Sequence, residues 1–78
     1  MEAGHEHRHL AQVDRYIAEA KVHIAQQRAL IQRMIEAAQS TELAMSMLET
    51  LEGNLQAFER HREFILNRMK DGHKIERP

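Results

Sequence analysis

The sequence has no cysteine, and only one proline and three glycines occur among its 78 residues. Without cysteine, disulfide cross-links and thiolate zinc sites are excluded. A chain of this length buries only about 60% of the surface that it exposes when unfolded, so one copy alone is marginally stable. Association with another chain is therefore the expected source of additional stability.

Charge of one sign and long apolar runs are also missing. Eleven Lys and Arg oppose twelve Asp and Glu, and no acidic or basic block stands out, so no nucleic-acid partner is expected. Apolar runs reach only three residues, as at 64–66, so no membrane-spanning segment is expected. The first nine residues lack the apolar core of a signal peptide, which makes a cytoplasmic location the expectation.

Strong helix formers (Ala, Leu, Glu, Gln, Arg and Met) fill most of the chain. The candidate break is Gln39-Ser40-Thr41, where Ser40 or Thr41 can cap a new helix, and Asp71-Gly72 is a stop signal. We predict a helical hairpin over residues 7–72, with a first helix over about 7–38, a turn at 39–40 and a second helix over about 41–71. Residues 1–6 are predicted to be a flexible histidine-rich leader and residues 73–78 a disordered tail.

Apolar residues recur in a heptad pattern along both predicted helices, which is typical of a coiled-coil seam. Folding the chain near residue 39 places the stripes opposite one another, with the numbers of facing residues adding to 78 or 79, as for Ile24 and Leu55. The fold class is thus predicted to be all-α, an antiparallel two-helix coiled-coil hairpin. The seam positions are Leu10, Val13, Ile17, Ala20, Ile24, Gln27, Ile31, Met34 and Ala38 in the first helix, and Ala44, Leu48, Leu51, Leu55, Phe58, Arg62, Ile65 and Met69 in the second.

Three residues are unusual for a coiled-coil helix. Gly53 lies inside the second predicted helix, but the apolar spacing continues through it without a slip, so one continuous helix is expected. Gln27 and Arg62 stand at seam positions. A buried polar residue there can fix the register and the oligomeric state at a cost in stability. The alternative, which we favour, is that both reach the rim, Arg62 toward Asp14 or Glu59.

The flanks of the seam predict one apolar edge and one charged edge, where Arg28 can pair with Glu49. An apolar edge along a whole hairpin is larger than the patches that soluble monomers expose. We therefore expect a homodimer, a four-helix bundle, as the first option among homo-oligomers. The residues predicted to mediate self-association are Tyr16, His23, Leu30, Leu43, Ala57 and Phe64.

Histidines gather near the open end of the predicted hairpin. His5 and His9 lie four residues apart, and the folded register brings His73 toward them, so His5, His9 and His73 form a candidate metal site. The competing interpretation is that these are solvated histidines with adventitious affinity for nickel or zinc. His23 is expected in the interface, and His61 is expected to be solvated.

The segments 9–19, 27–31 and 61–66 resemble a group of short, uncharacterised helical-hairpin proteins of proteobacteria, especially rhizobial-type bacteria. They read His9-Leu-Ala-Gln-Val-Asp-Arg-Tyr-Ile-Ala-Glu19, Gln27-Arg-Ala-Leu-Ile31 and His61-Arg-Glu-Phe-Ile-Leu66. The turn of that group contains Gly or Asp, whereas this chain has Gln39-Ser40-Thr41. The resemblance implies a helical hairpin and assigns no activity, so no functional residue follows from it.

No nucleophile–base arrangement and no cofactor motif appears in the sequence, so an enzyme is not expected. The predicted function is a non-enzymatic interaction or scaffold module that acts as a homo-oligomer and docks on a protein partner through its helix faces. The alternative is a metal-binding or metal-sensing bundle that uses the histidine-rich end.

Overall fold

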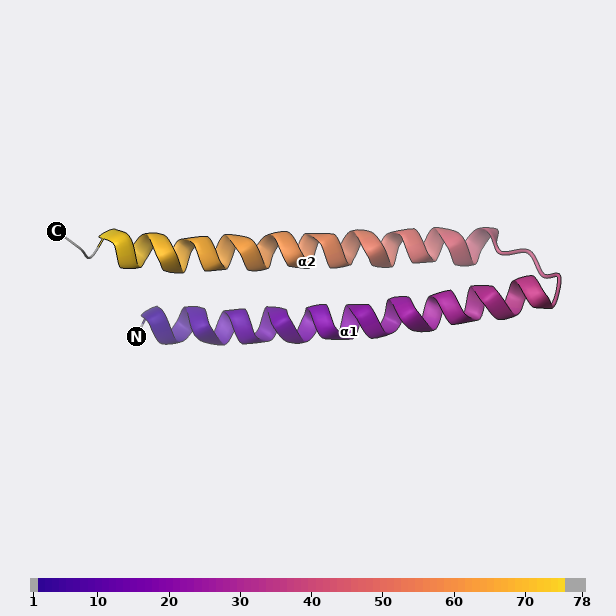
Figure 1. Cartoon of the computed structure of the whole chain (residues 1–78), viewed down its shortest axis with the longest axis horizontal. Helices are drawn as coiled ribbons and strands as arrows, with labels where there is room; N and C mark the ends of the chain where they lie inside the picture. The colour runs from indigo at the N-terminus through magenta and orange to yellow at the C-terminus, as the bar shows by residue number, and fades with distance from the viewer. Residues whose placement is uncertain (1, 76–78) are drawn as a thin grey trace.

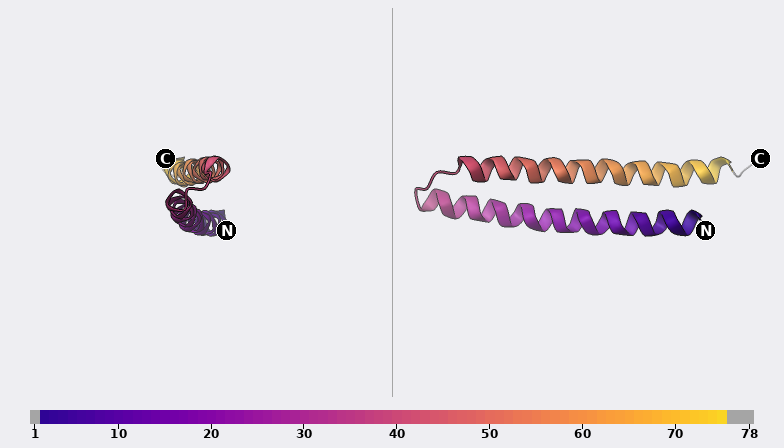
Figure 2. Two further views of the ribbon diagram at one scale, coloured as in Figure 1. Left: turned by 90° about the vertical axis from the view of Figure 1, so that its right-hand side faces the viewer. Right: turned by 180° about the vertical axis from the view of Figure 1, so that it is seen from behind.

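Two long α-helices make up the chain in a computed structural model, which describes the backbone of residues 2–75 and the side chains of residues 5–70. Helix α1 spans Glu2–Glu36 and α2 spans Glu42–Ile75, with no strand in the described part of the chain. The helices run antiparallel and lie side by side in every view (Figures 1 and 2). The predicted all-α hairpin is confirmed.

Both helices are longer at the open end than the sequence predicted. The structure has α1 from Glu2 where a flexible leader was expected, so that prediction is wrong for residues 2–6. Among these residues only Gly4 disfavours a helix. The carboxylate of Glu6 lies 3.8 Å from the guanidinium of Arg68 on α2. Likewise α2 continues past Gly72 to Ile75, so the predicted tail is helical as far as that residue. Residues 76–78 lie outside the described residues.

The turn covers residues 37–41 and is longer than the two residues predicted. The N–H of Gln39 donates to the carbonyl of Met34 at 2.8 Å, and the N–H of Ala38 donates to that of Ile35 at 3.0 Å. This pair of bonds is the Schellman ending of a helix, whose left-handed residue is usually glycine. Here Ala38 takes that conformation, with φ of 59°, and so leaves the predicted seam. Helix α2 then starts where the Thr41 carbonyl accepts a bond from Met45.

The pairing register differs from the predicted one by about one helical turn. The predicted seam pairs add to 78 or 79. Several contacts across the seam instead lie near a sum of 75: Tyr16 packs on Phe58, Arg62 donates to Asp14 at 2.6 Å, and Glu6 lies beside Arg68, with sums of 74, 76 and 74. The contact between Arg62 and Asp14 was itself expected.

The difference in register comes from the heptad phase of α2, that is, from which of its residues occupy the a and the d positions. Ala44 and Leu48 are four residues apart, which is the step from a d position to the next a position. In antiparallel pairs a positions face d positions, so the Ala44 stripe faces the Leu10 stripe. Facing residues then add to 75, which puts Ile24 opposite Leu51. Side chains that cross the seam reach up to five residues to either side of this register, since Gln27 and Ala44 add to 71 and Arg28 and Glu52 add to 80.

The seam itself is confirmed residue by residue. Every predicted seam position from Leu10 to Met69 is buried or half-buried except Ala38, which lies in the turn. Gln27 does not reach the rim: it is half-buried, and its Nε2 donates to the Ala44 carbonyl at 2.9 Å. This bond ties a polar seam residue to one place on the facing helix, so it favours the observed register. The residues at the centre of the seam are Val13, Ala20, Ile24, Ile31, Ala44 and Ile65.

The resulting molecule is a rod. Its extents are 65 × 15 × 12 Å and its radius of gyration is 18.1 Å, whereas a compact domain of this length has a radius of about 11–12 Å. No side chain among the described residues is less than 2% exposed. A single seam therefore leaves most of both helices in contact with solvent.

The left-handed Ala38 provides a test of the turn. Replacing it in Ala38→Gly relieves the contact between Cβ and the backbone that this conformation imposes, and we expect the free energy of unfolding to rise by about 0.5–1 kcal/mol. Urea unfolding followed by circular dichroism measures this. The neighbouring Ala37→Gly is the matched control, and it should be neutral or destabilising. A loss of stability in Ala38→Gly would contradict the Schellman ending.

Gly53 lies within α2 without interrupting it, as predicted. A Cβ added there meets nothing within 4 Å, so Gly53→Ala removes a helix-weakening residue without a clash. We expect stability to rise by about 1 kcal/mol. The reverse change at an outer position of α1, Ala29→Gly, should lower it by a similar amount in the same urea experiment. An unchanged midpoint in Gly53→Ala would show that residue 53 is not helical in solution.

Candidate functional site

One side of the hairpin carries a row of exposed apolar side chains, here called the apolar face. It comprises Tyr16, Leu30, Leu43, Met47 and Phe64, of which Leu43 is 84% exposed and Phe64 56% exposed. Tyr16, Leu30 and Met47 border the seam directly at g positions. Leu43 and Phe64 lie one turn before Met47 and Arg68 respectively, so they extend the same strip outward on α2.

The predicted self-association residues are thus all exposed, although not in the pairing expected. Leu43, Ala57 and Phe64 were predicted at g positions, which flank the seam. The corrected phase places them at c positions, one row further from the seam on the same side. His23 and Ala57 are exposed on the same side. Met47 belongs to this side as well and was not predicted. The four-residue step from Ala44 to Leu48 could have identified Met47, because it makes Leu48 an a position and Met47 the g position before it.

Aromatic contacts hold parts of the apolar face in place. The Tyr16 ring packs against Phe58 of the seam, with ring centroids 5.7 Å apart. Phe64 stacks on His61 at 6.5 Å, and the guanidinium of Arg68 lies over the Phe64 ring at 5.9 Å. Phe64 is therefore positioned by its neighbours along α2 while more than half of its surface stays exposed.

The opposite side of the hairpin carries ion pairs, as the sequence predicted, although Ile35 and Met45 are also exposed there. Arg62 reaches Asp14 at 2.6 Å, which confirms one of its two expected partners. Arg28 pairs with Glu52 at 2.8 Å, so the predicted partner Glu49 is wrong. The corrected phase gives the reason, since it places Glu52 and not Glu49 beside the seam on this side.

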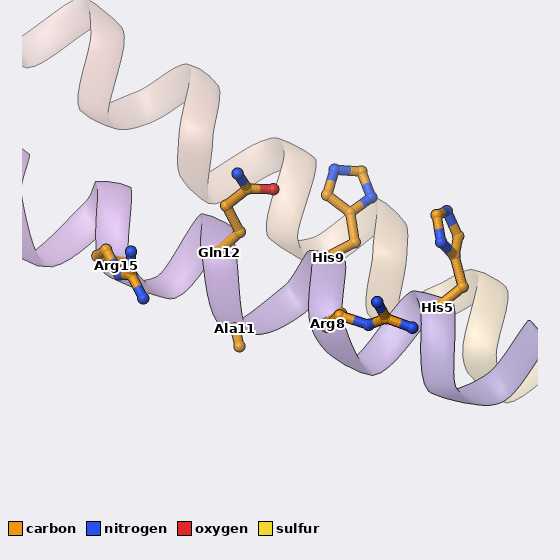
Figure 3. A pocket seen from close by; sticks show the side chains of 6 residues that line it. All are labelled: His5, Arg8, His9, Ala11, Gln12 and Arg15. Carbon is orange, nitrogen blue, oxygen red and sulfur yellow. The ribbon is translucent and has the colours of Figure 1, made fainter.

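The described side chains cover only two members of the predicted metal site, His5 and His9. His73 lies in the end of α2 that projects beyond the start of α1 (Figure 1), and its side chain is outside the described ones. Among the described residues, no three His, Asp or Glu side chains lie close enough to hold a metal ion. His5 and His9 share one open hollow on α1, of about 600 Å³, with Arg8, Ala11, Gln12 and Arg15 (Figure 3).

A histidine pair across the two helices was missed by the sequence interpretation. The Nε2 atoms of His9 and His61 are 3.3 Å apart, and their rings meet edge to face with centroids at 5.0 Å. His61 was expected to be solvated, and it is exposed, but its contact with His9 was not predicted. In the corrected phase both residues occupy g positions, which adjoin one another in an antiparallel pair.

No protein-family model, curated protein or solved structure matches the chain. The resemblance to proteobacterial hairpin proteins therefore stays a prediction. Within residues 2–75, neither helix contains a stretch long and apolar enough to cross a membrane.

A double-mutant cycle on Arg28 tests the corrected register. The coupling energy between Arg28→Ala and Glu52→Ala should be about 0.2–1 kcal/mol, the range for exposed ion pairs, and it should shrink at high salt. The cycle of Arg28→Ala with Glu49→Ala is the matched control and should give no coupling. Coupling to Glu49 in place of Glu52 would restore the register first predicted from the sequence.

Proposed function

We infer that the chain is a non-enzymatic interaction module that associates with a second copy of itself through the apolar face, as a dimeric four-helix bundle in the cytoplasm. The observation that carries this proposal is the row of Tyr16, Leu30, Leu43, Met47 and Phe64, exposed along one side of a hairpin with a single seam. Rows of this kind mark interaction sites in soluble proteins.

The exposed area supports a partner of the size of the chain itself. The hairpin exposes 6426 Å², whereas a compact folded protein of 9.1 kDa exposes about 4,900 Å². The excess of roughly 1,500 Å² falls within the range that each partner of an obligate dimer buries, about 1,000–2,500 Å². Packing one hairpin on another along their length is the simplest way to cover such an elongated surface.

The composition of the apolar face favours a second copy as the occupant. In a two-fold dimer the same face meets itself, so it must not carry unpaired charge. The face presents aromatic and aliphatic groups, and the imidazoles on this side, His9, His23 and His61, have an uncharged form. The guanidinium of Arg68, which lies over the Phe64 ring, has the carboxylate of Glu6 at 3.8 Å. The charges of Asp14, Arg28, Glu52 and Arg62 are paired on the other side, where they remain in solvent. A finished bundle would present that charged side to any further protein partner.

The dimer proposal predicts that a charge on the apolar face separates the copies. Leu30→Glu or Phe64→Glu should weaken dimerisation at least about tenfold, because each variant buries two unpaired carboxylates in a symmetric interface. Light scattering across a dilution series measures the mass. Val22→Glu is the matched control. Val22 is 54% exposed, close to the 56% of Phe64, but it lies on the outer surface of α1 away from the apolar face.

The control distinguishes an effect specific to the apolar face from a general effect of an added charge. Val22→Glu should keep the mass and the dissociation constant of the wild type. A wild-type chain that is folded and monomeric at all concentrations would contradict the dimer. Equal dissociation by Val22→Glu and Phe64→Glu would contradict the assignment of the interface to the apolar face.

A further inference from the structure

The His9–His61 pair has the spacing of two ligands of one metal ion. In a tetrahedral zinc site the Zn–N bonds are about 2.0–2.1 Å, so two ligand nitrogens lie about 3.3–3.4 Å apart. The two Nε2 atoms are 3.3 Å apart in the hairpin. Two neutral imidazoles at this distance share one hydrogen bond, in which one Nε2–H donates to the other Nε2.

We propose that His9 and His61 form a binding site for a divalent transition-metal ion of the zinc class, which links α1 to α2 near the open end of the hairpin. Imidazole nitrogen is a ligand suited to zinc, copper and nickel, whereas calcium and magnesium prefer oxygen. The donor imidazole shifts its proton from Nε2 to Nδ1, which frees both Nε2 lone pairs for the ion. Binding therefore requires no net loss of a proton from the neutral pair.

The pair supplies two ligands, so further groups must fill the remaining positions on the ion. His5 lies one helical turn before His9 on α1, and both line the same hollow, so a rotation of the His5 side chain is the nearest route to a third imidazole (Figure 3). Water completes the remaining positions. Arg8, Arg15 and Arg68 lie around this end of the hairpin, and their positive charge opposes a cation. Affinity must therefore come from ligation by uncharged imidazoles rather than from electrostatic attraction.

The site differs from a histidine tag in its use of both helices. A tag-like leader would bind through His5 and His9 on α1 alone, and the fold of α2 would not matter to it. A bridging ion binds the hairpin only when α1 and α2 are paired, so it stabilises the folded state in proportion to its affinity. The removal of His61, which lies 52 residues from His9 in the sequence, separates the two arrangements.

Zinc titration of the full-length chain tests the proposal, with isothermal calorimetry for affinity and circular dichroism melts for stability. We expect one zinc ion per hairpin and a rise in the midpoint of thermal unfolding of roughly 5 °C or more at tenfold excess over the dissociation constant. Both His61→Gln and His9→Gln should weaken zinc binding at least about tenfold and abolish the thermal shift. His23→Gln is the matched control, an exposed histidine on the same side, and should behave as the wild type.

Three results would overturn the site. The first is zinc affinity in His61→Gln equal to that of the wild type, together with a loss in His5→Gln, since binding would then reside on α1 alone. The second is saturation without any thermal shift in the wild type. The third is a zinc-dependent doubling of the mass by light scattering that His61→Gln abolishes, because the ion would then join two hairpins instead of the helices of one. Melts of both glutamine variants without zinc confirm that each remains helical.

Discussion

Two antiparallel helices share only one line of side chains, because each presents a single stripe to the other. The most buried residue of this seam, Val13, is still 3% exposed, and the leucines, methionines and phenylalanine of the seam are half-buried. Folding an isolated hairpin must therefore offset the entropy of ordering about seventy residues with little enclosed surface. The elongated shape, the excess exposed area and the apolar face all follow from this shortage of a core.

The phase of the seam decides which side chains meet and which remain exposed. The four-residue step from Ala44 to Leu48 places His61 beside His9 and Glu52 beside Arg28. The same phase leaves Phe64 and Leu43 on the outer strip of α2. Inside the seam, the side chain of Gln27 donates to the Ala44 carbonyl, so this half-buried amide is paired in the observed alignment.

The helices, the hairpin and the seam could be predicted from the sequence, because they depend on the spacing of apolar residues along the chain. The register was not read correctly, since the same stripes also face each other one turn away and only the phase of α2 distinguishes the two arrangements. The turn was misjudged because Ala38 adopts a backbone conformation that alanine disfavours. Leu43 and Phe64 were nevertheless placed on the correct side, since their strip adjoins the g positions. His61 was missed because its partner lies on the other helix, where the register alone determines the contact.

The two ends of the hairpin differ in how firmly the chain itself restrains them. Near the turn, Gln27 and Ala44 are separated by 17 residues, so their contact closes a short loop. At the open end, His9 and His61 close a loop of 52 residues, which carries a larger entropic cost. Two polar contacts there, His9 with His61 and Glu6 with Arg68, are long or exposed and add little stability. An ion bound between His9 and His61 would therefore act at the end where closing the hairpin costs the most entropy, and it would restrain Phe64, which stacks on His61.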